Sequence, residues 1–362
     1  MAGQPPYPPT VGPTFPQHPG LWHGLTVRRH GIPAVLIATA LLGGMSCSSN
    51  DDDPVPVTGS SPAAGATPGA SAPTTAPPTS GTTPAPAPTG PADAEGDVSQ
   101  APPVGVNGFR VLGDRAFIAD LRGDEVLAVD TSTGRITNRW PGLGGADDLD
   151  PGPDGSLWVT GYTAGELWRI RPDGTTTMVA TLEVGLNPIV VTGDGLVVLA
   201  RTEATATGFE GDALWVLDSN APEGTEPSRI EADLQGANGF GMDADGTILA
   251  ARMVTDPTEA GLIRIDPATG EITELNTGFN FPTGVARRND GTVAVVQWNP
   301  PAVLIADPLD LGTPPTKLAD LSFNPDNIDV AGDGTIWVSW VAGPKLARIA
   351  ADGTVSELII GS

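Results

Sequence analysis

Short apolar runs recur behind a tight-turn signal throughout residues 104–362. Each turn is a Gly-Asp or Asp-Gly pair, and the run behind it is rich in β-formers, as in Leu157–Thr160. A further run, such as Glu166–Ile170, alternates apolar and polar residues as a half-buried strand does. The turn aspartates stand 40 to 51 residues apart. They are Asp114, Asp154, Asp194, Asp245, Asp290 and Asp333.

These repeated units predict a β-propeller. Four strands in a unit of roughly 43 residues are typical of one propeller blade, so six units predict six blades of four antiparallel strands each. A small sheet with two apolar faces cannot stand alone, and the blades must therefore pack face to face around an axis. The last unit ends in its own fourth strand, within Thr354–Ile360, so closing the ring needs little or no strand exchange. We therefore predict an all-β fold, with a six-bladed propeller over residues 104–362.

One polar position repeats in all six units, seven residues before each turn aspartate and at the start of the innermost strand. Its occupants are Asn107, Asp147, Asn187, Asn238, Thr283 and Asp326. Because inner strands begin at one mouth of the central channel, we expect these side chains to form a ring of oxygens. Such ligands, with two carboxylates among them, suit Ca²⁺ best, or Mg²⁺ and Mn²⁺. The ring without Thr283 is our candidate metal site; alternatively, its residues cap strand entries and bind water.

The rim of the same mouth supplies candidate ligand-binding residues. Arg201 and Arg252 end two neighbouring strands just below two long loops. Two arginines in an acidic domain are candidates to clamp a carboxylate or phosphate, although they could instead neutralise acids in those loops. Trp298 and Trp340, together with Tyr162, predict an aromatic patch suited to sugars or lactones. We therefore expect a small-molecule or envelope ligand.

The N-terminal 103 residues predict an export signal followed by a linker. Arg28 and Arg29 precede a short apolar run, Ile32–Leu42, and small residues lead to Cys47, which is typical of a secretory signal. Cys47 resembles the lipidated cysteine of bacterial lipoproteins, so we expect residues 1–47 to direct export and an outward-facing membrane anchor. The alternative is a non-lipidated signal and a secreted protein. Residues 48–103 are rich in Pro, Ala, Thr, Ser and Gly, which predicts a disordered linker.

Charge and residue content exclude several classes of function. The net charge is −25 for the chain and −21 for residues 104–362, which would repel phosphate backbones, so we expect no nucleic-acid partner. All three histidines precede residue 31, so the repeat region has no His for a catalytic triad, a general base or a His-rich zinc site. We expect a monomer.

Three segments at the polar ring resemble the senescence-marker-protein/gluconolactonase family, also called regucalcin-like, and more loosely strictosidine synthase-like propellers. They are Asn238–Gly246, Phe281–Val285 and Asn324–Val330. The resemblance implies a divalent metal held by a Glu, two Asn-type positions and an Asp that also acts as catalytic base.

This sequence matches that implied set only in part. Asn187 and Asn238 match the amide positions, whereas Thr283 occupies the Asp position and the Glu has no clear counterpart. Asp326 or Asp147 is then our candidate for the catalytic proton acceptor.

Two classes of function remain open. One is a metal-dependent lactone or ester hydrolase of gluconolactonase type, and the other is a non-catalytic surface propeller that binds a protein, glycan or cell-wall component. A third class, a virginiamycin B lyase-like enzyme, is suggested by Pro153–Val159, but that resemblance implies a catalytic His, which the repeat region lacks. Whether the protein is an enzyme is left open by the sequence.

Overall fold

The computed structural model describes residues 89–93, 96–204, 209–211, 213–310 and 312–362. The predicted signal segment, including Cys47, and the predicted linker up to residue 88 lie outside these residues. Within the described part, the chain folds into strands, turns and loops, and we find no helix whose length and apolar character would let it cross a bilayer.

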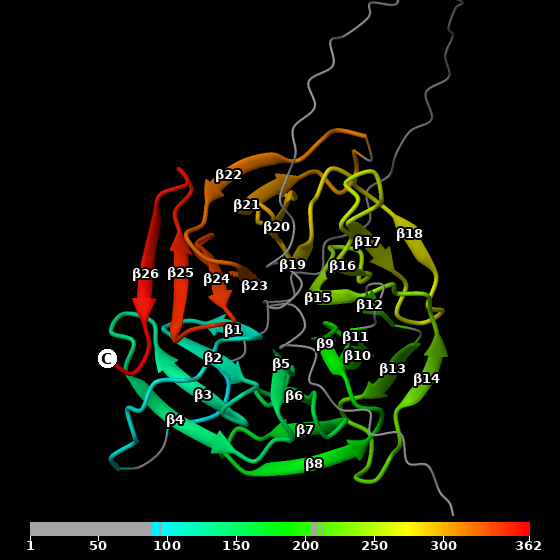
Figure 1. Ribbon diagram of the computed structural model, residues 1–362. Coiled ribbons are helices and arrows are strands. Elements are labelled where there is room, and N and C mark those ends of the chain that lie inside the picture. Colours follow the sequence, from blue (N-terminus) through cyan, green and yellow to red (C-terminus); the bar gives the residue numbers. More distant parts are fainter. Residues whose placement is uncertain (1–88, 94–95, 205–208, 212, 311) are drawn as a thin grey trace, which may run out of the picture. The chain divides into compact units, whose positions relative to one another are not determined.

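Six four-stranded antiparallel sheets surround a common axis (Figure 1). They are the six predicted blades, so the propeller prediction is confirmed. Blade 1 consists of β1 (Phe109–Leu112), β2 (Arg115–Asp120), β3 (Glu125–Asp130) and β4 (Ile136–Pro141). Blade 2 consists of β5 (Ala146–Pro151), β6 (Leu157–Gly161), β7 (Glu166–Ile170) and β8 (Thr176–Thr181). Blade 3 consists of β9 (Leu186–Val191), β10 (Leu196–Arg201), β13 (Ala213–Asp218) and β14 (Ser228–Glu231).

The remaining blades repeat the same order of strands. Blade 4 consists of β15 (Ala237–Met242), β16 (Ile248–Arg252), β17 (Leu262–Ile265) and β18 (Ile272–Glu274). Blade 5 consists of β19 (Pro282–Arg287), β20 (Val293–Trp298), β21 (Pro301–Ala306) and β22 (Thr316–Asp320). Blade 6 consists of β23 (Pro325–Val330), β24 (Ile336–Trp340), β25 (Lys345–Ile349) and β26 (Val355–Ile359). Blade 6 contains its own outer strand, as expected, and the first strand of every blade lies nearest the axis (Figure 1).

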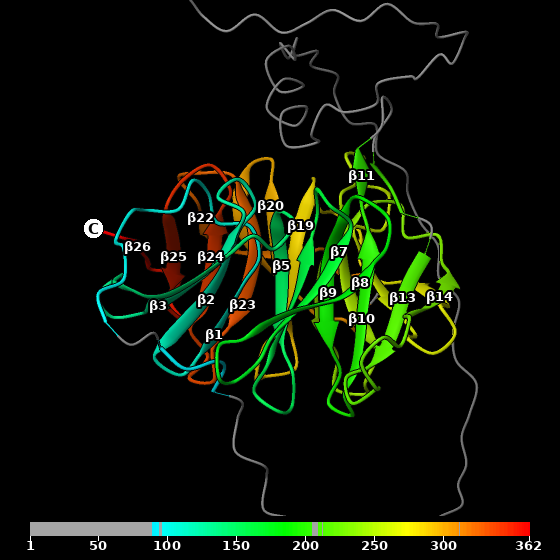
Figure 2. The same cartoon turned by 90° about the horizontal axis from the view of Figure 1, so that it is seen from below.

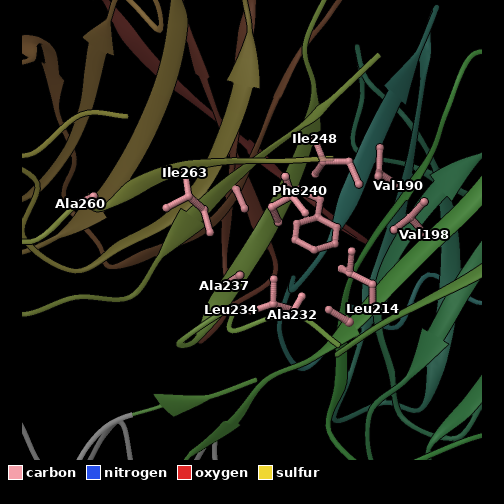
Figure 3. Packing of buried hydrophobic residues seen from close by; sticks show 13 residues of the cluster. Val190, Val198, Leu214, Ala232, Leu234, Ala237, Phe240, Ile248, Ala260 and Ile263 are labelled. Carbon is pink, nitrogen blue, oxygen red and sulfur yellow. The ribbon is translucent and has the colours of Figure 1, made fainter. Parts of the chain in front are cut away.

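Apolar side chains fill the seams between neighbouring blades, with one buried cluster at each seam. At the seam of blades 3 and 4, Phe240 packs among Val190, Val198 and Leu214 (Figure 3). Full burial of one such side chain stabilises the fold by about 1.5–3 kcal/mol. The core is therefore divided into six wedges, which leaves the axis itself free for polar side chains.

A short hairpin interrupts blade 3 between β10 and β13. It pairs β11 (Glu203–Ala204) with β12 (Phe209–Glu210). Seen from the side, β11 stands at one edge of the ring of blades (Figure 2). The hairpin corresponds to the first of the two long loops noted in the sequence.

Residues 96–103, here called the strap, cross the seam between the first and last blades. The Gln100 side chain donates to the carbonyl of Ile136 and accepts from its backbone N–H, at 2.8 and 2.9 Å. Val98 packs against the buried cluster of that seam, and Gly361 of the C-terminus lies against the strap. The sequence placed these residues at the end of the linker; in the structure they contact blades 1 and 6.

Candidate functional site

The six ring residues lie together at one mouth of the channel, as the repeat spacing predicted. The Asn107 amide donates to Asp147 Oδ1 at 2.9 Å. The Asn187 amide donates to Asn238 Oδ1 at 2.8 Å, and the Asn238 amide donates to the carbonyl of Thr283 at 2.8 Å. These bonds link adjacent ring positions on blades 1 and 2 and across blades 3, 4 and 5.

Bulges position the ring side chains. The pairing register of the innermost strand shifts at the ring position in blades 2 to 6, for example between Ala146 and Leu149 in β5. A bulge adds a residue to one strand and turns its side chain out of the regular alternation. The local irregularity therefore lets a polar side chain face the axis while the rest of the strand packs into the seams.

Two carboxylates lie near each other at the mouth, that of Asp147, which is buried, and that of Asp326, which is half-buried. Asp147 is 3% exposed, and its Oδ2 has no hydrogen-bond partner. Burial raises the pKa of Asp147 well above its usual value, and the charges of Asp326 and Asp148 raise it further. Burial also raises the pKa of Asp326 to about 6, although the neighbouring Asn238 amide opposes this. The two carboxylates favour a proton or a cation between them.

The donor set at the mouth fits a divalent cation of the kind that the family resemblance implies. The carboxylates of Asp147 and Asp326 and the amide oxygens of Asn107 and Asn187 are hard oxygen ligands. The unpartnered Asp147 Oδ2 is the atom that most needs such an ion. Within the described residues, no group of three or more His, Cys, Asp or Glu side chains is gathered for a metal, so amide oxygens would have to complete the shell.

Thr283 stands at the position where the family resemblance implies a catalytic Asp. It is 1% exposed, and its hydroxyl donates to the carbonyl of Pro325 at 3.4 Å. A hydroxyl in this setting cannot serve as a general base at neutral pH. Any proton acceptor at this mouth must therefore be a different residue.

The two rim arginines are both paired with acids of the same chain. Arg201 forms ion pairs with Glu183 at 2.6 Å and with Glu203 at 2.8 Å. Arg252 is buried, donates to the carbonyl of Ala260, and pairs with Glu274 on the outermost strand at 3.1 Å. Of the two hypotheses for these arginines, ligand binding and neutralisation of nearby acids, the ion pairs support neutralisation. The Arg252 side chain points away from the mouth, toward the outermost strand of its blade.

The aromatic candidates lie at different places on the rim. Tyr162 donates to the carbonyl of Thr202 at 3.4 Å, and burial and then the charge of Asp147 raise its pKa, which places it beside the ring. Trp298 donates its indole N–H to the carbonyl of Pro325, next to Asp326 in the chain. Trp340 instead packs on blade 6, with the Lys345 ammonium 4.6 Å from its ring.

A second charged layer lies in the channel below the ring and was not expected from the sequence. Arg110 pairs with Asp150 at 2.5 Å and reaches across the axis to the carbonyl of Phe240, on the opposite blade, at 3.4 Å. Asp329 accepts from the backbone N–H of Val111 at 2.7 Å. Burial raises the pKa values of Asp150 and Asp329, and the charge of Arg110 opposes the rise. The Arg110 side chain therefore spans the channel from blade 1 to blade 4 beneath the mouth.

The sequence did carry a signal for this layer. Arg110, Asp150 and Asp329 each stand three residues after a ring position of their own blade. A charged residue at the same offset in three adjacent blades marks a common depth in the channel. The spacing does not predict which of these charged side chains form ion pairs.

Fold and mouth together define a six-bladed β-propeller with an acidic, oxygen-rich opening. Among solved structures, the chain is similar to a streptogramin B lyase, with 17% identity and a TM-score of 0.54 over 72% of this chain and 84% of that one. It is also similar to an inactive histidine variant of virginiamycin B lyase from Staphylococcus aureus with quinupristin, with 16% identity and a TM-score of 0.51 over 71% and 84%. These similarities concern the fold alone. A comparison with curated proteins found no match.

Residues 189–360 match the family model described as the SMP-30/gluconolactonase/LRE-like region. The match runs from the first strand of blade 3 to the end of blade 6 and includes the ring residues Asn238, Thr283 and Asp326. The family resemblance inferred from the sequence is thereby confirmed for this part of the propeller.

Proposed function

We propose that this propeller binds a divalent cation, Ca²⁺ in the first place, at the channel mouth and uses it to bind and hydrolyse a small lactone or related ester. The supporting observation is the pair of carboxylates at the mouth, of which Asp147 is buried with an unpartnered Oδ2 and Asp326 is half-buried. Two such groups are costly to hold together unless a proton or a cation offsets their charge. The family match of residues 189–360 makes lactone chemistry the first choice.

Different residues of the mouth would bind the cation, position its ligands and accept the proton. Asp147, Asn107 and Asn187 would hold the cation, with Asn238 positioning Asn187 through their 2.8 Å bond. When bound, such an ion polarises a carbonyl or a water molecule. Water adds to the carbonyl carbon, the proton that it loses passes to Asp326, the ring C–O bond breaks, and the leaving oxygen takes up a proton. A carboxyl with a pKa of about 6 is mostly ionised at pH 7 and can accept that proton.

Calorimetric titration with Ca²⁺, Mg²⁺ and Mn²⁺ tests the cation site. We expect binding at millimolar concentration or tighter in the natural chain, and its loss in Asp147→Asn and Asn187→Ala. Asp352→Asn is the matched control, because Asp352 is an exposed turn residue whose carboxylate accepts from the backbone N–H of Thr354 in its own turn. Absence of both heat and a thermal shift with all three ions would rule out the site.

A second candidate function is a non-catalytic propeller that binds an envelope component. The observation in its favour is Thr283, which stands where the family resemblance implies a catalytic base and is already hydrogen-bonded. A panel of lactones in the presence of the bound cation separates the two functions. Turnover that is lost in Asp326→Asn favours the hydrolase, whereas cation binding without turnover favours the binding propeller.

We also propose that the protein is exported and anchored through Cys47, on the sequence alone. The propeller would then face outward, away from the membrane. Replacement of Cys47 by serine should release the protein from the membrane fraction of cells. Unchanged partitioning into that fraction would contradict the lipid anchor.

A further inference from the structure

We propose that Phe281 and Trp298, backed by Phe209, form an aromatic subsite at the mouth that selects small neutral ring compounds, such as cyclic esters or sugars, over open-chain ones. This inference rests on the proposed ligand-binding function of the mouth and names the class of ligand. Neither Phe209 nor Phe281 was among the ligand-binding residues predicted from the sequence.

Three aromatic rings from three separate elements contact one another in series, one pair edge-to-face and the other tilted, and are here called the stack. The centroids of Phe209, in the inserted hairpin, and Phe281, just before β19, are 5.6 Å apart with planes at 63°. Those of Phe281 and Trp298, at the end of β20, are 5.2 Å apart with planes at 43°. Each of the three residues is half-buried, so part of the stack remains open to a ligand.

The backbone holds Phe281 in an unfavourable conformation to complete this stack. Its φ is +57°, a region that bulky residues rarely adopt. The conformation is fixed because its N–H donates to the carbonyl of Val254 at 2.8 Å and its carbonyl accepts from the N–H of Trp298 at 3.0 Å. Gly236 makes room for the stack, since a Cβ there would lie 2.4 Å from the Cβ of Phe209. Residues held in strained conformations cluster at binding sites.

The stack adjoins the polar ring. Trp298 donates its indole N–H to the carbonyl of Pro325, which also accepts from the ring residue Thr283 and immediately precedes the ring residue Asp326. Phe281 is two residues before Thr283. One ligand can therefore contact an aromatic face and the ring oxygens at the same time.

The chemistry of these neighbours defines the ligand. Aromatic faces pack against the apolar C–H face of a compact ring, and a few polar groups fix its orientation. A rigid ring also loses less conformational entropy on binding than its open-chain counterpart. The carboxylates of Asp147, which is buried, and Asp326, which is half-buried, disfavour an anion, so the fitting ligand is neutral.

The test compares ring and open-chain probes on the full chain by saturation-transfer NMR. The pairs are methyl β-glucopyranoside with glucitol, and δ-valerolactone with methyl pentanoate, the lactone being measured before it hydrolyses. We expect at least one ring probe to bind about tenfold more tightly than its partner, with transfer strongest to its ring C–H protons. Equal affinity of ring and open-chain probes in both pairs, or no binding of either ring, would overturn the proposal.

Two variants assign any binding to the stack. Trp298→Leu should weaken ring binding about tenfold, and Trp168→Leu is the control, because Trp168 lies on the third strand of blade 2 and bonds to Glu166. Phe281→Gly removes a ring while glycine accepts the positive φ, so this variant should fold and still lose ring binding. Retained ring binding in both Trp298→Leu and Phe281→Gly would refute the subsite.

Cation calorimetry on the same samples separates this proposal from the proposed function. If the cation binds and the rings do not, the aromatic subsite fails while the metal site stands. If the rings bind through Trp298 and Phe281 without the cation, the subsite stands and the metal site fails.

Discussion

Replacing Arg110 with methionine probes the charged layer that lies in the channel beneath the mouth. The Arg110 and Asp150 side chains are 11% and 10% exposed, and their contact measures 2.5 Å. Burial raises the pKa values of Asp148 and Asp329, and the positive charge of Arg110 opposes this rise. Methionine keeps much of the side-chain volume and removes the charge, so the variant leaves several buried carboxylates without their counter-charge.

The expected loss follows from that arrangement. Removing one partner of a buried ion pair costs about 3–5 kcal/mol, because an uncompensated charge stays behind. In a domain of this size each kcal/mol lowers Tm by about 2–4 °C, so the variant should melt about 6–20 °C lower. Adding Asp150→Asn to Arg110→Met should recover part of that loss, because the second change removes one of the stranded charges.

The loss should also depend on pH. The pKa of Asp148 is about 7 even with Arg110 present, so without Arg110 the layer must take up protons to stay buried. Proton uptake is easy at pH 5 and costly at pH 8, and the destabilisation should therefore be larger at pH 8. Urea unfolding followed by circular dichroism at both pH values measures it. A loss below about 1 kcal/mol at pH 8, or no relief from Asp150→Asn, would refute this account of the layer.

Three further predictions concern the rest of the propeller. Burial raises the pKa of Asp326 to about 6 in the folded protein. The stability that this group contributes is therefore fully present below about pH 4 and is lost as the pH rises through 6. We expect the free energy of unfolding, measured by thermal or urea unfolding, to be about 1–3 kcal/mol larger at pH 5 than at pH 8. Gly108→Ala should cost about 1–3 kcal/mol because its Cβ would lie 2.1 Å from a carboxylate oxygen, whereas Gly193→Ala, with nothing within 4 Å, should change stability by less than about 0.5 kcal/mol. Deleting residues 1–103 should lower Tm by several degrees relative to deleting 1–95, because the strap is lost; equal Tm values would show that the strap does not stabilise the seam.

The ring at the mouth could be predicted because repeat symmetry turns a sequence offset into a position in space. Asn107 and Asp147 stand 40 residues apart, and their side chains are bonded at 2.9 Å. The aromatic stack could not be found in this way, since Phe209, Phe281 and Trp298 come from an inserted hairpin, a loop and a strand end. No shared offset relates them.

The ion-pair partners of charged side chains also could not be predicted from the sequence. Arg201 and Arg252 occupy equivalent positions, yet one pairs with two nearby acids and the other with the outermost strand of its blade. Repeat spacing places a side chain but not its rotamer. The strap was missed for a different reason: its composition is that of a linker, and its contacts in the folded protein, such as those of Gln100 with Ile136, are what distinguish it.

The sequence by itself determined the blades, their number and the polar residue at the start of each inner strand, because these features depend on periodicity, which is a local property. Tertiary structure alone decided that Arg110 spans the axis to Phe240, 130 residues away in the chain. Contacts of this kind arise only once the ring has closed, when the opposite blade fixes what a long side chain can reach.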